Sequence, residues 1–150
     1  MPTTLLHRNK AAQANTSPVP TPAITRVLVI DDNKDMALML GLLLRKMGYE
    51  VMATNHVMDG LGWAHKAHPE VVLLDLQMPG IDGYETCRLL RTSKWGACAT
   101  VVAVTGHAEP EDRARSKEAG FDYHLAKPID RALLFSVLNV AAADRADGPQ

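Results

Sequence analysis

Five polar residues of this chain stand where apolar runs end, and their side chains together could bind a cation and accept a phosphoryl group. They are Asp31, Asp32, Asp75, Thr105 and Lys127. Carboxylates about 4 Å apart repel each other by ~1–4 kcal/mol, so three of them are tolerable together when a divalent cation lies among them. Mg²⁺ suits this role because it prefers oxygen ligands and keeps positions open for water and phosphate oxygens. One carboxylate could then attack a phosphoryl group while the metal and the lysine neutralise its oxygens.

These residues meet only if the elements that carry them bring the ends of the apolar runs together. The chain alternates short apolar runs with stretches in which apolar residues recur at helical spacing. We expect strands at 26–30, 49–54, 70–75, 100–105 and 123–126, and helices at 36–47, 57–67, 83–92, 111–119 and from 131 onward. Five strand–helix pairs predict an α/β fold, (βα)5, with a doubly wound parallel five-stranded sheet. Ligands of such folds bind outside the carboxyl ends of the strands, which is where the five polar residues stand.

Two of the expected helices differ in their apolar faces. The first carries Met36, Met39 and Met47 on one apolar stripe, and we expect these methionines to fill the core. The fourth offers only Ala114 and Ala119 as an apolar face. Few buried apolar contacts predict low local stability, which would let this helix move when a residue of the site moves.

Composition limits the classes of protein to which the chain can belong. Its 150 residues, 47% of them apolar, suit one domain with tails. We expect a disordered tail or linker at 1–24, the domain at 25–143 and a flexible C-terminal tail at 144–150. The net charge of −1 gives no basic excess for binding nucleic acid, and no apolar run reaches the length of a membrane span. Two cysteines and no secretory signal favour the cytoplasm.

Four stretches carry a specific resemblance to a known family. They are VLVIDDN, VVLLDLQMPGIDGYE, VVAVTGHA and AGFDYHLAKPID. They resemble the receiver domain of two-component response regulators, over about residues 26–142, and imply its flavodoxin-like fold. By this resemblance Asp75 is the phosphoacceptor. Asp31, Asp32, Asp75 and the backbone carbonyl of Gln77 would hold Mg²⁺.

The same resemblance implies roles for the residues around the phosphoryl group. Thr105 is the switch hydroxyl, and Lys127 contacts the phosphate and precedes a cis proline. The family usually carries an aromatic residue three positions before this lysine, where His124 stands, so His124 is either a switch residue or a partly buried strand residue. Gln77 and His107 occupy positions where the family tunes the lifetime of the phosphoryl group. His107 could shield that group or position the attacking water.

The resemblance implies signalling rather than catalytic turnover. The phosphoryl donor would be a phosphohistidine on a histidine kinase or a histidine phosphotransfer domain. A downstream protein would bind the face of the fourth helix, fifth strand and fifth helix. We expect a monomer or weak dimer that binds neither nucleic acid nor membrane, either as a stand-alone regulator or as part of a hybrid kinase.

Two other functions are compatible with the same fold. One is a Mg²⁺-dependent phosphatase or phosphotransferase that forms a similar aspartyl phosphate. Enzymes of the haloacid dehalogenase type need a second acid two residues after the nucleophile, where this chain has Gln77. The other is an interaction module that works without phosphorylation, which an acidic pocket unable to bind Mg²⁺ would favour.

Overall fold

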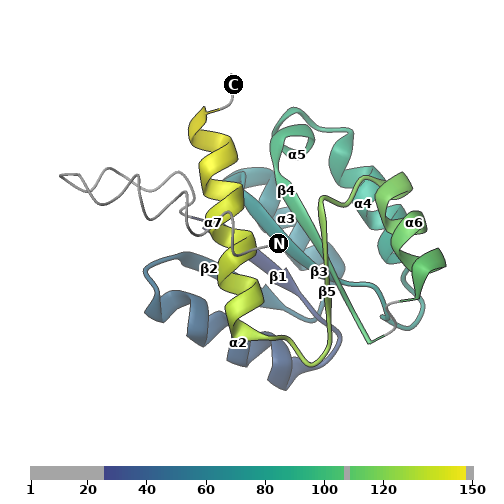
Figure 1. Ribbon diagram of the computed structural model, residues 1–150, viewed down its shortest axis with the longest axis horizontal. Coiled ribbons are helices and arrows are strands. Elements are labelled where there is room, and N and C mark those ends of the chain that lie inside the picture. Colours follow the sequence, from purple (N-terminus) through teal and green to yellow (C-terminus); the bar gives the residue numbers. More distant parts are fainter. Residues whose placement is uncertain (1–25, 107–108, 148–150) are drawn as a thin grey trace.

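Five parallel strands form a single sheet in the order β2–β1–β3–β4–β5, with helices on both faces (Figure 1). The computed structural model describes residues 26–106 and 109–147. Its elements are β1 (Arg26–Ile30), α2 (Lys34–Lys46), β2 (Glu50–Thr54), α3 (Val57–Ala67), β3 (Val71–Asp75), α4 (Gly83–Arg91), α5 (Lys94–Cys98), β4 (Thr100–Thr105), α6 (Pro110–Ala119), β5 (Tyr123–Ala126) and α7 (Arg131–Asp147). The predicted flavodoxin-like α/β fold is therefore confirmed. The short helix α5 was not predicted.

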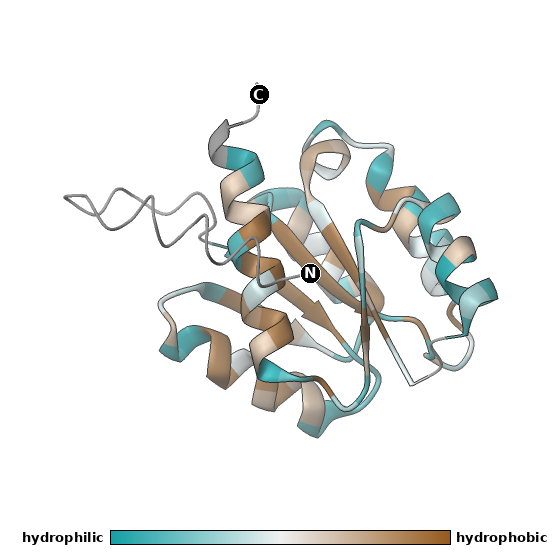
Figure 2. Cartoon of the chain, in the orientation of Figure 1, coloured by the Kyte–Doolittle hydropathy of each residue, from teal (hydrophilic) through white to brown (hydrophobic). Residues whose placement is uncertain are grey.

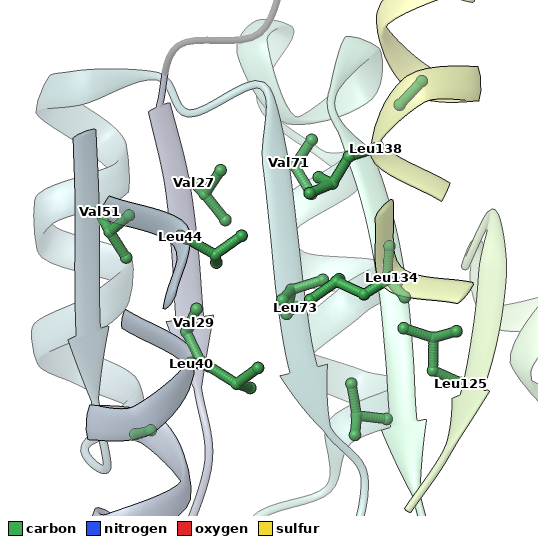
Figure 3. Close-up of a cluster of buried hydrophobic side chains, with 14 residues drawn as sticks. Val27, Val29, Leu40, Leu44, Val51, Val71, Leu73, Leu125, Leu134 and Leu138 are labelled. Carbon is green, nitrogen blue, oxygen red and sulfur yellow. The ribbon is translucent and has the colours of Figure 1, made fainter. Parts of the chain in front are cut away.

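The three central strands β1, β3 and β4 are buried on both faces because their apolar side chains alternate between two cores. Val71 and Leu73 of β3 belong to the cluster that α2 and α7 cover (Figure 3). Val72 and Leu74 of the same strand belong to the cluster that α3, α4 and α6 cover. All five residues of β3 are buried, so the central strand is held firmly from both sides.

Side-chain caps fix where α2, α4 and α7 begin, and the start of α2 lies beside the candidate site. Asn33, not Asp31 or Asp32, caps α2, since its side chain accepts a hydrogen bond from the backbone N–H of Met36. Asp82 caps α4 in the same way, and an Asp130 oxygen accepts bonds from two amides of α7. The two acidic residues after β1 are therefore available for another role.

Helix α2 corrects the expectation that Met39 and Met47 fill the core, whereas Met36 is partly buried and packs against it as expected. Met39 is 64% exposed and Met47 is 41% exposed. The buried residues of α2 are Ala37, Leu40, Gly41 and Leu44. A Cβ atom at Gly41 would come within 3.2 Å of the Ala53 side chain, so small residues let α2 approach β2 closely. Leu38, Met39 and Leu42 are left on the outer surface.

Helix α6 buries even less apolar surface than its sequence suggested. Ala119 is buried as expected, but Ala114 is exposed and the other buried residue is Ser116. In Figure 2 the ribbon of this helix is coloured mainly as hydrophilic residues. Helix α6 therefore buries only two small side chains, and its Arg115 guanidinium lies over the ring of Tyr84 on α4, 4.2 Å from the ring centroid.

The last helix is longer than expected. Helix α7 continues to Asp147, through part of the segment 144–150 for which we expected a flexible tail. Leu134, Leu138 and Ala141 anchor this helix on the sheet. Among the described residues, no helix has the length and apolarity needed to span a membrane.

Arg91, at the end of α4, joins four parts of the fold away from the candidate site. Its guanidinium donates hydrogen bonds to the backbone carbonyls of Gly96, Ala99 and Gly120, and forms an ion pair with Asp122 at 2.8 Å. The same Asp122 oxygen also accepts from the backbone N–H at the start of β4. One side chain thus connects α4, α5, β4 and the loop before β5.

Candidate functional site

Two carboxylates and an ammonium group meet at the carboxyl ends of the central strands. The Nζ atom of Lys127 lies 3.3 Å from an oxygen of Asp31 and 3.3 Å from an oxygen of Asp75. Ile30 is paired with Leu74, so the strand register places Asp31 beside Asp75. Each of the two carboxylates is only 2% exposed. Three sequence-predicted residues therefore lie together.

Backbone amides hold both carboxylates in position. One oxygen of Asp31 accepts a hydrogen bond from the N–H of Asn33, at 2.9 Å. One oxygen of Asp75 accepts from the N–H of Gln77 at 2.9 Å, and the other from the N–H of Asp32 at 3.4 Å. These bonds are local consequences of the loops that follow β1 and β3. They keep the oxygens oriented toward the space that Lys127 also faces.

Burial and mutual repulsion shape the electrostatics of this cluster. Burial raises the pKa of Asp31, and the neighbouring Asp75 adds to the rise, although a backbone hydrogen bond and Lys127 oppose it. Burial alone would lower the pKa of Lys127, but the two carboxylates outweigh it and the pKa is raised. Lys127 thus stays protonated. One ammonium group faces two carboxylates, so the cluster favours a further cation.

The donor set fits Mg²⁺ better than a metal held by side chains alone. Mg²⁺ commonly binds through one or two carboxylates and retains several waters. Asp31 and Asp75 would supply the two carboxylates. Within the ranges 26–106 and 109–147, no group of three or more His, Cys, Asp or Glu side chains is arranged around one point. Asp32 is exposed and lines a neighbouring hollow, so its carboxylate stands at the rim of the cluster.

Thr105, the last residue of β4, is buried close to this cluster. It is 2% exposed, and its backbone carbonyl accepts a hydrogen bond from the N–H of Lys127 at 2.8 Å. Asp75 is paired with Val104, the residue before Thr105. The predicted switch hydroxyl therefore stands one residue beyond the partner of the predicted acceptor. His107 lies outside the described residues.

His124 stands on β5, three residues before Lys127, and its ring lies beside Ser116 of α6. Its Nδ1 atom is 3.5 Å from the Ser116 hydroxyl, and its buried Nε2 has no hydrogen-bond partner among the described residues. Burial lowers the pKa of this imidazole, Arg113 lowers it further, and Asp112 opposes both. The lowered pKa favours the neutral form of the ring. Its predicted switching role stays a prediction.

Two features near the cluster could not be anticipated from sequence patterns. The side-chain oxygen of Gln77 accepts a hydrogen bond from the backbone N–H of Gly106 at 2.7 Å. In addition, an apolar hollow of about 340 Å³ lies between α2 and the loop after Lys127. Its lining residues are Met36, Met39, Leu40, Leu43, Pro128, Ile129 and Arg131. Met36 and Met39 line this hollow, although their spacing in the sequence suggested core positions for both.

Comparison with known protein families gives a match over most of the chain. The family model of the response regulator receiver domain matches residues 27–139. Among curated proteins, the chain is 30% identical over 120 residues to protein PilH of Pseudomonas aeruginosa. That match covers 80% of this chain and 99% of PilH.

Solved structures agree with this match. The chemotaxis protein CheY4 of Vibrio cholerae has a TM-score of 0.74 and 26% identity, covering 79% of this chain and 98% of that one. The receiver domain of the sensor histidine kinase PA1611 of Pseudomonas aeruginosa has a TM-score of 0.71 and 28% identity. It also covers 79% of this chain and 98% of the solved chain, and its structure contains a magnesium ion coordinated in the active-site cleft.

Proposed function

Because the chain belongs to the response regulator receiver domain family, we propose that Asp75 accepts a phosphoryl group from a phosphohistidine, with Mg²⁺ bound beside it. The observation that carries this proposal is the contact of Lys127 with both Asp31 and Asp75 at 3.3 Å. A buried nucleophile, a second carboxylate and a lysine then share one small space. Receiver domains are signalling modules, so uptake and loss of this one group would be the whole chemical cycle.

Each proposed residue has one task in the transfer. An oxygen of Asp75 attacks phosphorus, the bond from phosphorus to the donor imidazole nitrogen breaks, and the leaving imidazole keeps that electron pair. Lys127 neutralises charge on the transferred oxygens and the Thr105 hydroxyl donates a hydrogen bond to one of them. Asp31, Asp75 and the carbonyl of Gln77 would hold Mg²⁺ directly, and Asp32 through water. When bound, Mg²⁺ would supply positive charge to the same oxygens.

A change at Thr105 would be passed to the edge of the sheet. β4 is paired with β5, and α6, which precedes β5, is attached to the sheet through Ser116 and Ala119. Movement of the loop after Thr105 would therefore shift α6 at small energetic cost. We place the binding surface for a downstream protein on α6, β5 and α7. The proposed compartment is the cytoplasm, in keeping with two free cysteines.

Phosphoryl uptake from a small donor tests this function. Incubation with phosphoramidate and Mg²⁺ should add one phosphoryl group, detected by intact mass, and hydroxylamine should remove it because an acyl phosphate is cleaved by this nucleophile. Addition of EDTA should prevent uptake. A chain that takes up no phosphoryl group under these conditions, or one stable to hydroxylamine, would contradict the proposal. Sustained hydrolysis of phosphate esters would instead favour the alternative function, a phosphatase. The presence of neutral Gln77 where such enzymes need a second acid argues against that function.

The donor protein is expected to bind the apolar hollow beside α2. Asp75 is buried, so the donor must approach over the rim of the site, and the hollow is lined by Pro128, which directly follows Lys127. Met39 lines this hollow and is 64% exposed. Burying a methionine side chain contributes ~1.5–3 kcal/mol. Met39→Gln is therefore expected to weaken the affinity for a phosphohistidine protein, measured in phosphoryl transfer, at least ~10-fold.

The two kinds of donor make this prediction specific. Met39→Gln should leave uptake from phosphoramidate unchanged, because this small donor needs no docking surface. The matched control is Leu89→Gln on α4, 58% exposed on the opposite face of the sheet, which should change neither reaction. Equal slowing with both donors would assign Met39 to the chemistry or the fold rather than to docking.

A further inference from the structure

The side chain of Gln77 joins two loops that border the site. Its Oε1 accepts from the backbone N–H of Gly106 at 2.7 Å, while the backbone N–H of Gln77 donates to an oxygen of Asp75 at 2.9 Å. Gly106 directly follows Thr105, so it opens the loop between β4 and α6. Gln77 is thus bonded both to the proposed phosphoacceptor, Asp75, and to the backbone amide of the residue that follows the proposed switch residue, Thr105.

The contact fits a glycine closely. A Cβ atom at position 106 would lie 3.1 Å from the Oε1 of Gln77, which is tighter than ordinary van der Waals contact. No other heavy atom of the described residues would come within 4 Å of that Cβ, apart from those of its chain neighbours. The side chain of Gln77 is therefore the group that would have to shift if residue 106 carried one.

From these contacts we infer that Gln77 is a positioning residue, which holds the loop after Thr105 in its unphosphorylated position and releases it when the phosphoryl group arrives. This inference rests on the proposed function. A phosphoryl group on Asp75 would bring anionic oxygens close to Thr105 and to the amide of Gly106. Anionic oxygens accept hydrogen bonds more strongly than the neutral amide oxygen of Gln77. The N–H of Gly106 could exchange one acceptor for the other and stay bonded in both positions.

The hydrogen bond between Gln77 and Gly106, which we call the latch, sets the size of the expected effect. A neutral hydrogen bond near the surface changes a conformational equilibrium by roughly 2- to 10-fold. Loss of the Gln77–Gly106 bond should therefore raise the affinity for a phosphoryl analogue by about that factor. A merely structural role of Gln77 would lower stability and would not raise this affinity.

Two single variants and their combination test the latch. Gln77→Met keeps the length of the side chain and removes the amide oxygen, whereas Gly106→Ala leaves Gln77 intact and displaces its Oε1. Each is expected to raise the affinity for beryllofluoride in the presence of Mg²⁺ by roughly 2- to 10-fold. Both act on one contact, so the double variant should bind no more tightly than either single variant. Gly62→Ala is the matched control, because a Cβ there meets nothing within 4 Å.

The amide resonance of Gly106 gives a second readout that needs no ligand. In the unphosphorylated protein it should move in Gln77→Met, as expected on loss of a hydrogen bond, and stay in place in the Gly62→Ala control. Unchanged Gly106 resonance, unchanged affinity or additive effects in the double variant would each overturn the latch. If the wild-type chain itself bound no beryllofluoride and took up no phosphoryl group, the proposed function would fall, and the release step with it.

Discussion

Asp75→Asn is expected to abolish phosphoryl uptake from phosphoramidate and from a phosphohistidine protein alike. The amide nitrogen and oxygen of asparagine are neutral and weakly nucleophilic, so no acyl phosphate can form at this position. Loss of a nucleophile lowers reaction rates by several orders of magnitude, and we expect at least ~10³-fold here. Intact mass after incubation with the donor and Mg²⁺ measures the effect directly.

The fold should survive this change, because asparagine has nearly the same shape and can still accept the hydrogen bond from the N–H of Gln77. Circular dichroism of the variant should match that of the wild-type chain. Asp59→Asn is the matched control, since it makes the same chemical change at an exposed carboxylate that lines the hollow beside Asp32. Uptake at the wild-type rate in Asp75→Asn would exclude Asp75 as the acceptor.

Arg91→Ala is expected to cause the largest loss of stability among single substitutions of charged residues in this chain. The change leaves the carbonyls of Gly96, Ala99 and Gly120 without the donor that now serves them, and leaves Asp122 without its ion-pair partner. Hydrogen bonds that involve a charged group contribute ~1.5–3 kcal/mol each, and these are only partly additive. We expect the free energy of unfolding to fall by ~3–4 kcal/mol, measured by urea denaturation.

Two further variants show whether the loss of stability comes from the guanidinium contacts of Arg91, from its positive charge or from the removal of any arginine from α4. Arg91→Lys keeps the charge but cannot reach several carbonyls at once, so an intermediate loss is expected. Arg88→Ala removes the same side chain three residues earlier, where an exposed pair with Glu85 at 3.0 Å should contribute under ~1 kcal/mol. If Arg88→Ala were as destabilising as Arg91→Ala, the network around Arg91 would not explain the effect.

The strands and the polar residues at their ends could be predicted because local patterns determine them. Each apolar run is short and ends at a polar residue, and parallel pairing then brings these ends to one edge of the sheet. Asp31, Asp75 and Lys127 lie together for that reason. Their chemical roles stay predictions that the variants above can test.

Features that depend on distances across the fold could not be predicted in this way. Apolar residues surround much of α2, so their pattern alone does not show which of them are buried. The close approach of Gly41 to Ala53 shows which face of the helix lies against the sheet. Arg91 resembles an ordinary basic residue at the end of a helix, and its partners Gly120 and Asp122 are distant in sequence. The Gln77–Gly106 bond joins two loops whose relative placement is determined by the sheet.

The complete burial of β3 has a consequence for the direction in which a signal can travel. Both cores hold β3 through alternating side chains, so the backbone that carries Asp75 is held firmly in place. A change at Asp75 can therefore be transmitted only by displacing the elements around this strand. On one side lie β1 and the closely packed α2, and on the other lie β4, β5 and the lightly attached α6. A phosphoryl group on Asp75 is therefore expected to displace β4, β5 and α6 rather than β3 itself.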